Sequence, residues 1–253
     1  MGKVIALNHN WRYKAEWKEE FIAPSFDDSS WEAVHVPHAN LELPYNYFDE
    51  KSYQFISTYR QRFKLDQSHQ GKRILVNFEA VMAYAEVYLN GKLVGSHKGG
   101  YTPFSIDLTE HILFDKENVL TVQVDSRERD DIPPFGHMID YLCYGGIYRE
   151  VSLSILDPLY IKNVFAKPQN VLAETKQVET TVFLKNTDSK EQTITIEVNL
   201  SKDGQDMPKA QKEVTIAPNT EESFDIYLKD LEGIKLWDID SPNLYDLKVK
   251  LSR

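Results

Sequence analysis

Alternation between apolar and polar residues is clearest in the second half of the chain. From Gln192 to Leu200 the aliphatic residues fall at every second position, so Ile194 and Ile196 lie on one side of an extended backbone. A period of two over a short segment is typical of a half-buried β-strand. The same alternation recurs in residues 223–228 and 245–251. These segments are therefore predicted to be strands with one face in a core.

Short segments of the same kind occur along the rest of the chain. Two of them are joined by Asn90–Gly91, and because both residues tolerate positive φ, this pair predicts a tight hairpin turn. Strands separated by turn residues at this density favour β-sandwiches over alternating βαβ units. The further segments predicted as strands are residues 74–78, 83–89, 92–95, 119–124, 151–155, 160–164 and 213–217.

A domain boundary is predicted at Asp157–Pro158, where one strand closes and the next opens. Residues 1–157 have the length of a jelly roll, and residues 158–253 have the length of an immunoglobulin-like sandwich. The predicted fold class is therefore all-β, with a jelly-roll β-sandwich of the galactose-binding kind followed by an immunoglobulin-like β-sandwich.

The negative net charge of the chain argues against two classes of binding partner. The chain carries 29 Lys and Arg against 39 Asp and Glu, a formal net charge of −10, and has no basic cluster. An acidic surface repels both phosphate backbones and anionic lipids, so neither a nucleic acid nor a membrane is expected as a partner. Cys143 is the only cysteine, which rules out an internal disulfide. The lack of a disulfide does not identify the compartment, because periplasmic proteins can also lack disulfides, so both the cytoplasm and the periplasm of a bacterium remain open.

Motifs of several enzyme classes are absent from the sequence. It contains no G-x-S-x-G elbow, phosphate loop or G-x-G-x-x-G fingerprint. His35 and His38 form an H-x-x-H pattern in an extended segment, where they point to opposite faces, so structural roles are expected and no metal site. Glycoside hydrolysis needs two carboxylates, but 39 acidic residues make simple pairing uninformative.

Four groups of segments, in order along nearly the whole chain, resemble glycoside hydrolase family 2, the family of β-galactosidases and β-glucuronidases. The first group is an opening with a short acidic turn before Trp31, and the second is the Asn90–Gly91 hairpin with the strand after it. The third ends the first domain, and the fourth lies late in the second. Their residues are 10–12, 26–31 and 36–38; 87–91, 95–97, 99–104 and 106–109; 144–151; and 236–237 with 241–245.

This resemblance implies the N-terminal sugar-binding domain and immunoglobulin-like domain of a larger hydrolase of carbohydrate metabolism. The parent would be a retaining exo-β-glycosidase acting on terminal β-glycosides, with β-galactosidase the preferred assignment. In the family, both catalytic glutamates belong to a (β/α)₈ barrel of about 250 residues. The two sandwiches use the whole chain, and no Asn-Glu dipeptide of the family's acid/base kind occurs. The chain is therefore expected to be inactive alone, with no catalytic residue assigned.

Asp140 is the one residue to which the resemblance gives a substrate-binding role. The family carries an Asp nine residues before the Arg of its third segment, here Arg149, on a loop that reaches the active site of the barrel. Asp140 is thus expected to accept hydrogen bonds from sugar hydroxyls, since charge-assisted bonds are strong. No metal ligand is assigned and no cofactor is expected, apart from a sodium or magnesium ion in the full-length enzyme. The loop at residues 41–54 lies where the family sends a second finger, and its residues are left unassigned.

Individual side chains carry further expectations. Trp11, Trp31 and Trp237 are expected to be core anchors. Arg149 is expected to lie in a strand and to pair with a buried or interfacial carboxylate. The glycine pairs 99–100 and 145–146 are expected where a Cβ would be forbidden.

The end of the second domain carries an expectation about assembly. Compared with the family, this sandwich is expected to lack its last strand, which would leave an edge open to self-association as a homo-oligomer.

Alternatives to the β-galactosidase assignment remain. A β-glucuronidase parent would need cations for the carboxylate of its sugar, and these would lie in the barrel. A free-standing carbohydrate-binding module would bind sugar by itself. A purely structural or adhesive pair of sandwiches would make Asp140 irrelevant to hydrolysis.

Overall fold

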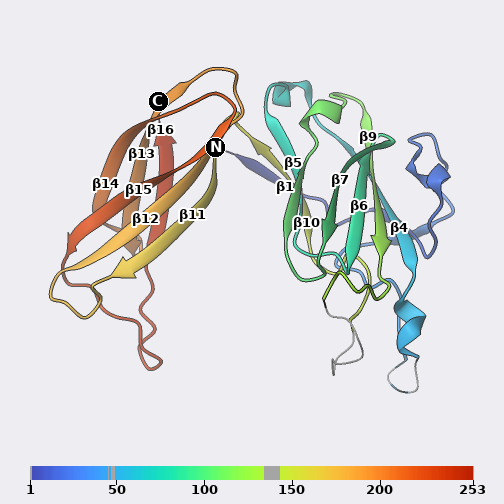
Figure 1. The fold of residues 1–253 in the computed structure, drawn as a ribbon, viewed down its shortest axis with the longest axis horizontal. Coiled ribbons are helices and arrows are strands. Elements are labelled where there is room, and N and C mark those ends of the chain that lie inside the picture. The colour runs from blue at the N-terminus through green and yellow to red at the C-terminus, as the bar shows by residue number, and fades with distance from the viewer. Residues whose placement is uncertain (1, 45, 47–48, 134–142, 253) are drawn as a thin grey trace. The chain divides into compact units, whose positions relative to one another are not determined.

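The computed structural model describes the whole chain except residues 1, 45, 47–48, 134–142 and 253. It divides into two compact units, Met1–Asp157 (unit 1) and Pro158–Arg253 (unit 2). Both are built from strands, which confirms the all-β fold class with two sandwiches (Figure 1). No helix in the described part of the chain is long and apolar enough to cross a membrane.

Unit 1 consists of two sheets. A four-stranded sheet has the order β1-β10-β5-β8, and a six-stranded sheet has the order β3-β2-β4-β9-β6-β7. All ladders in both sheets are antiparallel. The strands are β1 (Lys3–Ala6), β2 (Trp11–Lys14), β3 (Glu32–Val34), β4 (Ile56–Lys64), β5 (Arg73–Phe78), β6 (Tyr84–Leu89), β7 (Lys92–Lys98), β8 (Phe104–Asp107), β9 (Glu117–Asp125) and β10 (Val151–Leu156).

Short 3₁₀ helices and a tight turn connect these strands. The β6–β7 hairpin turns at Asn90 (φ 52°) and Gly91 (φ 84°), as the Asn-Gly pair predicts. The helices are η1 (Glu19–Ile22), η2 (Glu50–Tyr53), η3 (Gln67–His69) and η4 (Thr109–His111).

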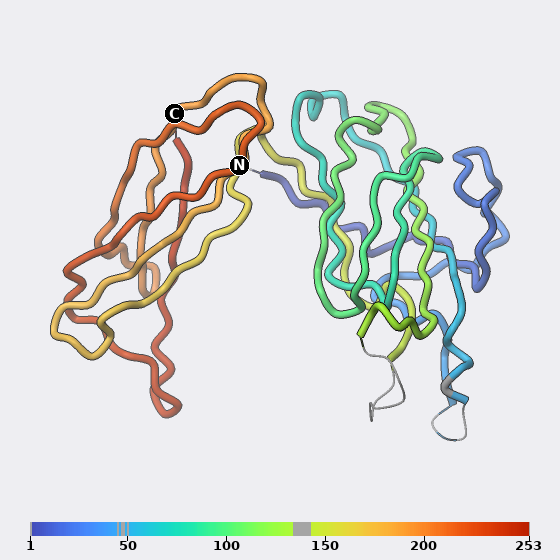
Figure 2. The backbone as a smooth tube through the Cα atoms, in the orientation of Figure 1, coloured from blue at the N-terminus to red at the C-terminus, as the bar shows by residue number. Residues whose placement is uncertain are grey.

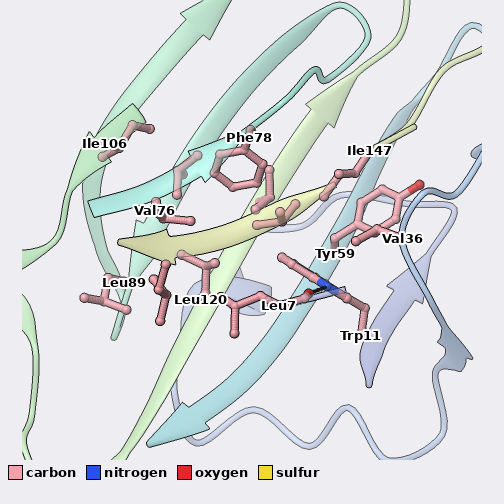
Figure 3. Packing of buried hydrophobic residues seen from close by; sticks show 14 of the residues in the cluster. Leu7, Trp11, Val36, Tyr59, Val76, Phe78, Leu89, Ile106, Leu120 and Ile147 are labelled. Atoms are coloured by element: carbon pink, nitrogen blue, oxygen red, sulfur yellow. Dashed lines mark hydrogen bonds between the residues drawn. The ribbon is translucent and has the colours of Figure 1, made fainter. Parts of the chain in front are cut away.

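The core of unit 1 lies between its two sheets. Phe78 of the four-stranded sheet and Leu120 of the six-stranded sheet both belong to it, because alternate residues of each strand point inward (Figure 3). Trp11 is fully buried in the same cluster, and its indole Nε1 donates to the carbonyl of Leu7. Trp31 is buried too, so the core prediction is confirmed for both of these tryptophans.

Arg60 of β4 is a charged residue that is fully buried in unit 1. Its Nε donates to Asp28 Oδ2 at 2.7 Å, and its Nη atoms donate to the backbone carbonyls of Phe21 and Ala23. Phe21 belongs to η1 and Ala23 follows it, in the segment between β2 and β3, whose carbonyls have no strand partners. Arg60 thus fastens this segment to the sheet.

Unit 2 consists of two three-stranded sheets with the orders β11-β12-β15 and β14-β13-β16. Its core is aliphatic, with residues such as Leu184, Ile196 and Ile226 buried along alternating strands. The strand predictions for this half of the chain are confirmed. The strands are β11 (Leu159–Gln169), β12 (Lys176–Asn186), β13 (Gln192–Lys202), β14 (Gln205–Ile216), β15 (Thr220–Leu231) and β16 (Asp246–Ser252).

The segment between β15 and β16 corrects one core prediction. Trp237 is 62% exposed there and is not a core anchor. The segment extends beyond the end of the sandwich (Figure 1). Trp237, Leu236 and Leu244 line one side of a largely apolar groove of about 480 Å³. The pairing partner of β16 in the described part of the chain is β13, and the missing last strand and the homo-oligomer both stay predictions.

Candidate functional site

Two long connections between strands of unit 1 meet at one end of the six-stranded sheet. One runs from β3 to β4 (residues 35–55) and the other from β9 to β10 (residues 126–150). The antiparallel register pairs Ile56, the first residue of β4, with Asp125, the last residue of β9. The end of the first segment and the beginning of the second are therefore adjacent, and the described parts of both lie at one end of unit 1 (Figure 2).

Asn40 ties these two segments together. Its backbone N–H donates to the carbonyl of Gly145 at 2.9 Å, and its side-chain Nδ2 donates to the carbonyl of Tyr53 at 2.9 Å. The carbonyl of Asn40 accepts from the buried hydroxyl of Tyr13. Asn40, Tyr53, Gly145 and Gly146 are called the loop junction below. Sequence reasoning missed Asn40, since nothing in its local pattern marks it as a bridge between distant segments.

Gly145 and Gly146 are required at the loop junction for two different reasons. A Cβ on Gly145 would collide with the Asn40 side chain and with the Oγ of Ser126. Gly146 has φ +114°, and a Cβ there would lie 2.5 Å from the carbonyl oxygen of His38. The expectation that a Cβ is forbidden at these two positions is therefore confirmed. Because the two glycines have no side chains, the two segments can approach each other closely.

His38 and Tyr59 form an uncharged floor beneath the loop junction. His38 Nδ1 lies 2.8 Å from Tyr59 Oη, and the two rings meet edge to face. Burial lowers the pKa of His38 and raises the pKa of Tyr59 well above its ordinary value. Both groups are therefore neutral at neutral pH. The two neutral side chains therefore support the backbone of the loop junction and offer no charge to a ligand.

Ion pairs hold the start of the second segment. Burial alone would raise the pKa of Asp125, but hydrogen bonds from Arg127 outweigh it and the pKa is lowered. Arg127 donates to both oxygens of Asp125, from Nε at 2.9 Å and from Nη2 at 2.8 Å. Arg129 and Lys98 pair with Asp131 in turn. These charges are matched with one another and fix residues 125–131 beside β7.

Asp140 lies outside the described residues, so the structure places only the ends of the loop that carries it. Those ends are held: Ser126 N donates to Phe55 O at 3.1 Å, and Gly145 accepts from Asn40. Within the described part of the chain, no group of three or more His, Cys, Asp and Glu side chains could hold a metal ion. The sodium or magnesium ion expected in the full-length enzyme stays a prediction.

The strand placement predicted for Arg149 is wrong, and its pairing with a buried or interfacial carboxylate stays a prediction. Arg149 lies before β10 and not within it, and it is exposed. Its Nη1 donates to the carbonyl of Tyr101 at 3.4 Å, and its guanidinium lies over the Tyr148 ring at 5.5 Å. No carboxylate pairs with it among the residues that the structure describes. An exposed guanidinium is hydrated by water and does not require such a partner.

Two family models match the chain in sequence order. The model for the sugar binding domain of glycosyl hydrolases family 2 matches residues 6–157, and a second model described as glycosyl hydrolases family 2 matches residues 159–253. Together these matches extend over nearly the whole chain, and they meet where unit 1 ends and unit 2 begins.

Known proteins of two activities are similar to the chain. A β-galactosidase of Thermoanaerobacterium thermosulfurigenes is 45% identical over 98% of the chain, which covers 35% of that protein. A β-glucuronidase of Formosa agariphila is 26% identical over 94% of the chain, which covers 27% of that protein. The crystal structure of a Bacteroides uniformis β-glucuronidase matches with a TM-score of 0.89 at 26% identity, covering 99% of this chain and 30% of that one. The chain thus spans about a third of the length of the curated relatives it matches.

Proposed function

The chain belongs to glycoside hydrolase family 2, and from this we propose that it forms the non-catalytic N-terminal portion of a retaining exo-β-glycosidase that hydrolyses terminal β-galactosides. The observation that carries the galactoside assignment is the 45% identity to a β-galactosidase along 98% of the chain. The two sandwiches occupy the residues that the two family models match. The catalytic carboxylates of the enzyme would then lie in a further domain, and the chain alone would hydrolyse nothing.

The role proposed for unit 1 is to hold a loop against the sugar. The loop junction fixes both ends of the Asp140 segment through buried backbone groups, and the ion pairs of Asp125 and Asp131 fix its approach. A carboxylate on such a loop recognises sugar hydroxyls only if both ends of the loop are held rigidly, because these hydrogen bonds depend on orientation. Asp140 is the residue proposed to accept these hydroxyl hydrogen bonds, and a sodium or magnesium ion beside it is part of the same proposal.

The exposed groove of unit 2 is consistent with a chain that is part of a longer enzyme. Trp237 and Leu244 are 62% and 73% exposed, and an apolar surface of this kind is usually covered by another part of a protein. The partner proposed for the chain is accordingly the catalytic domain of the same enzyme. The proposed substrate of the full-length enzyme is a carbohydrate.

A β-glucuronidase parent is the second candidate. It is favoured by the similarity to the Formosa agariphila enzyme and by the close fold match to the Bacteroides uniformis one. The two substrates differ in one group, a carboxylate in place of a hydroxymethyl. A cation is needed to receive that carboxylate. Near the loop junction His38 is neutral, and Arg127 and Arg129 are already paired with Asp125 and Asp131.

The test compares hydrolysis by the full-length enzyme and by the chain alone. The full-length enzyme is expected to release p-nitrophenol from the β-D-galactoside faster than from the β-D-glucuronide, and the 253-residue chain is expected to release none. Asp140→Ala in the full-length enzyme is expected to lower kcat/KM by roughly a hundredfold, the effect of losing oriented charge-assisted bonds. Asp130→Ala is the control, since it changes an exposed carboxylate outside the junction.

Three outcomes would overturn parts of this proposal. A preference for the glucuronide would favour the second candidate. An unchanged kcat/KM in Asp140→Ala would remove the role of that residue. Saturable micromolar binding of a galactoside to the isolated chain, measured by calorimetry, would favour a free-standing binding module.

A further inference from the structure

Two histidines of unit 1 that are far apart in the sequence meet at the surface. His9 Nδ1 lies 3.3 Å from His35 Nδ1, and both side chains are exposed. Their rings meet edge to face, with centroids 4.9 Å apart and an interplanar angle of 79°. The H-x-x-H pattern in the sequence pairs His35 with His38 instead, but His38 contacts Tyr59. The structure therefore replaces the sequence-based pair with a different one.

The backbone on both sides of the pair is held in place. Immediately beyond the β2–β3 ladder, Val36 N donates to Asn8 O at 2.8 Å. The carbonyl of His9 accepts from the side-chain amide Nε2 of Gln61 at 2.5 Å. Two side chains on anchored backbone lose little freedom when they bind one ligand together, so a ligand gains from this preorganisation.

The separation of the two nitrogens matches a metal chelate. Zinc–nitrogen bonds of about 2.0–2.1 Å at the tetrahedral angle place two ligand nitrogens about 3.3–3.4 Å apart. In the metal-free pair one Nδ1 carries the proton of the hydrogen bond and the other accepts it. A divalent ion that takes both lone pairs can replace that single proton with small rotations of two exposed rings.

We propose that His9 and His35 form a bidentate surface site for a divalent transition-metal ion of the zinc, nickel or copper class. Imidazole nitrogen suits these ions, whereas calcium and magnesium prefer oxygen ligands. The described residues supply no third ligand from His, Cys, Asp or Glu, so water completes the coordination. The ion would join the segment before β2 to the segment after β3, and its binding does not depend on the sugar chemistry proposed above.

Calorimetric titration of the 253-residue chain with nickel chloride tests the site at neutral pH. One ion is expected per chain. His9→Gln and His35→Gln are each expected to weaken binding roughly tenfold or more, since even a residue that only orients a metal ligand contributes about 10–100-fold. His111→Gln is the control, because His111 lies on η4 and its loss leaves the pair intact. Equal affinity in all three variants, or no saturable binding by the unchanged chain, would overturn the proposal.

A second measurement uses the unchanged chain and so does not depend on how the variants fold. Substoichiometric copper(II) is expected to broaden the imidazole NMR signals of His9 and His35 before those of the other five of its 7 histidines. The same ion is expected to raise the Tm of the unchanged chain and not that of His9→Gln, because only the folded pair binds it. Broadening that begins at another histidine would overturn the assignment.

Discussion

Unit 1 and unit 2 differ in what lies inside them. The interior of unit 1 contains charged groups, Arg60, Asp28 and Asp125, in addition to its aromatic and aliphatic core. The buried polar residues described in unit 2 are uncharged: Thr180, Asn186 and Ser201. The two units also differ in strand length, since most strands of unit 2 have 11 or 12 residues and those of unit 1 are shorter.

This difference follows from how each unit satisfies its backbone. Long paired strands satisfy their own N–H and C=O groups through the ladder. Irregular segments do not, and the segments around Phe21 and Asn40 take their partners from side chains and from one another. A domain that carries long loops therefore needs polar groups in its interior, and unit 1 is the one that carries them.

The largest test of this comparison is Arg60→Leu. Removing the guanidinium leaves Asp28 buried without its 2.7 Å partner, and breaking a buried pair on one side is expected to lower the free energy of unfolding of unit 1 by about 3–5 kcal/mol. Urea unfolding followed by tryptophan fluorescence reports mainly on this unit, which holds Trp11, Trp17 and Trp31.

Arg62→Leu is the matched control for Arg60→Leu. Arg62 contacts the same carboxylate at 3.1 Å, but its side chain is 31% exposed, so the expected loss is about 1 kcal/mol or less. Equal losses in the two variants would mean that burial of the charge is not what matters in unit 1.

A smaller effect is expected for Gly146→Ala at the loop junction. The substitution combines a φ of +114° with a Cβ that would lie 2.5 Å from His38 O, and together these are expected to destabilise unit 1 by about 3 kcal/mol. Gly71→Ala is the control, because φ is +81° there and nothing lies within 4 Å of the added atom, so about 1 kcal/mol is expected. Thermal unfolding of both variants makes the measurement, and a matching loss at Gly71 would remove close approach as the reason for Gly146.

The smallest effect, with the opposite sign, is expected in unit 2. The hydroxyl of Thr180 is fully buried and has no hydrogen-bond partner in the described part of the chain. Thr180→Val keeps the shape and removes an unpaired polar group, so a change between zero and about 1 kcal/mol of stabilisation is expected in urea unfolding.

Asn186→Ala provides the contrast within unit 2. Asn186 is fully buried and its Nδ2 donates to the carbonyls of Lys190 and Ala217, so its loss is expected to destabilise unit 2 by about 2 kcal/mol. If Thr180→Val proved as damaging as Asn186→Ala, the view of unit 2 as a domain held mainly by apolar packing would be wrong.

Local pattern predicted most of the fold. The period of two along β13 and β15 places Ile196 and Ile226 in the core, because the face to which a side chain points is set by backbone geometry alone. The turn at Asn90–Gly91 follows from the positive φ that these two residues tolerate. The positive φ of Gly146 is a local requirement of the same kind, whereas Gly145 is required by the close approach of Asn40 and Ser126.

The candidate site was predicted only in part. The resemblance to the family predicts that the loop carrying Asp140 and the neighbouring loop belong to the site, and the structure shows the ends of these two segments joined through Asn40 and Gly145. The bridging role of Asn40 could not be predicted from the sequence, because its partners lie in other parts of the chain and no local feature encodes them.

The sequence by itself thus determined the all-β class, the strand faces and the family, since these depend on short-range periodicity and on residues read in order. Only the tertiary structure decided exposure and partnership. It left Trp237 in solvent, placed Arg149 before β10 with its guanidinium on the carbonyl of Tyr101, and set His35 against His9. The physical reason is that burial and pairing depend on which distant segment covers a side chain, and chain order does not contain that information.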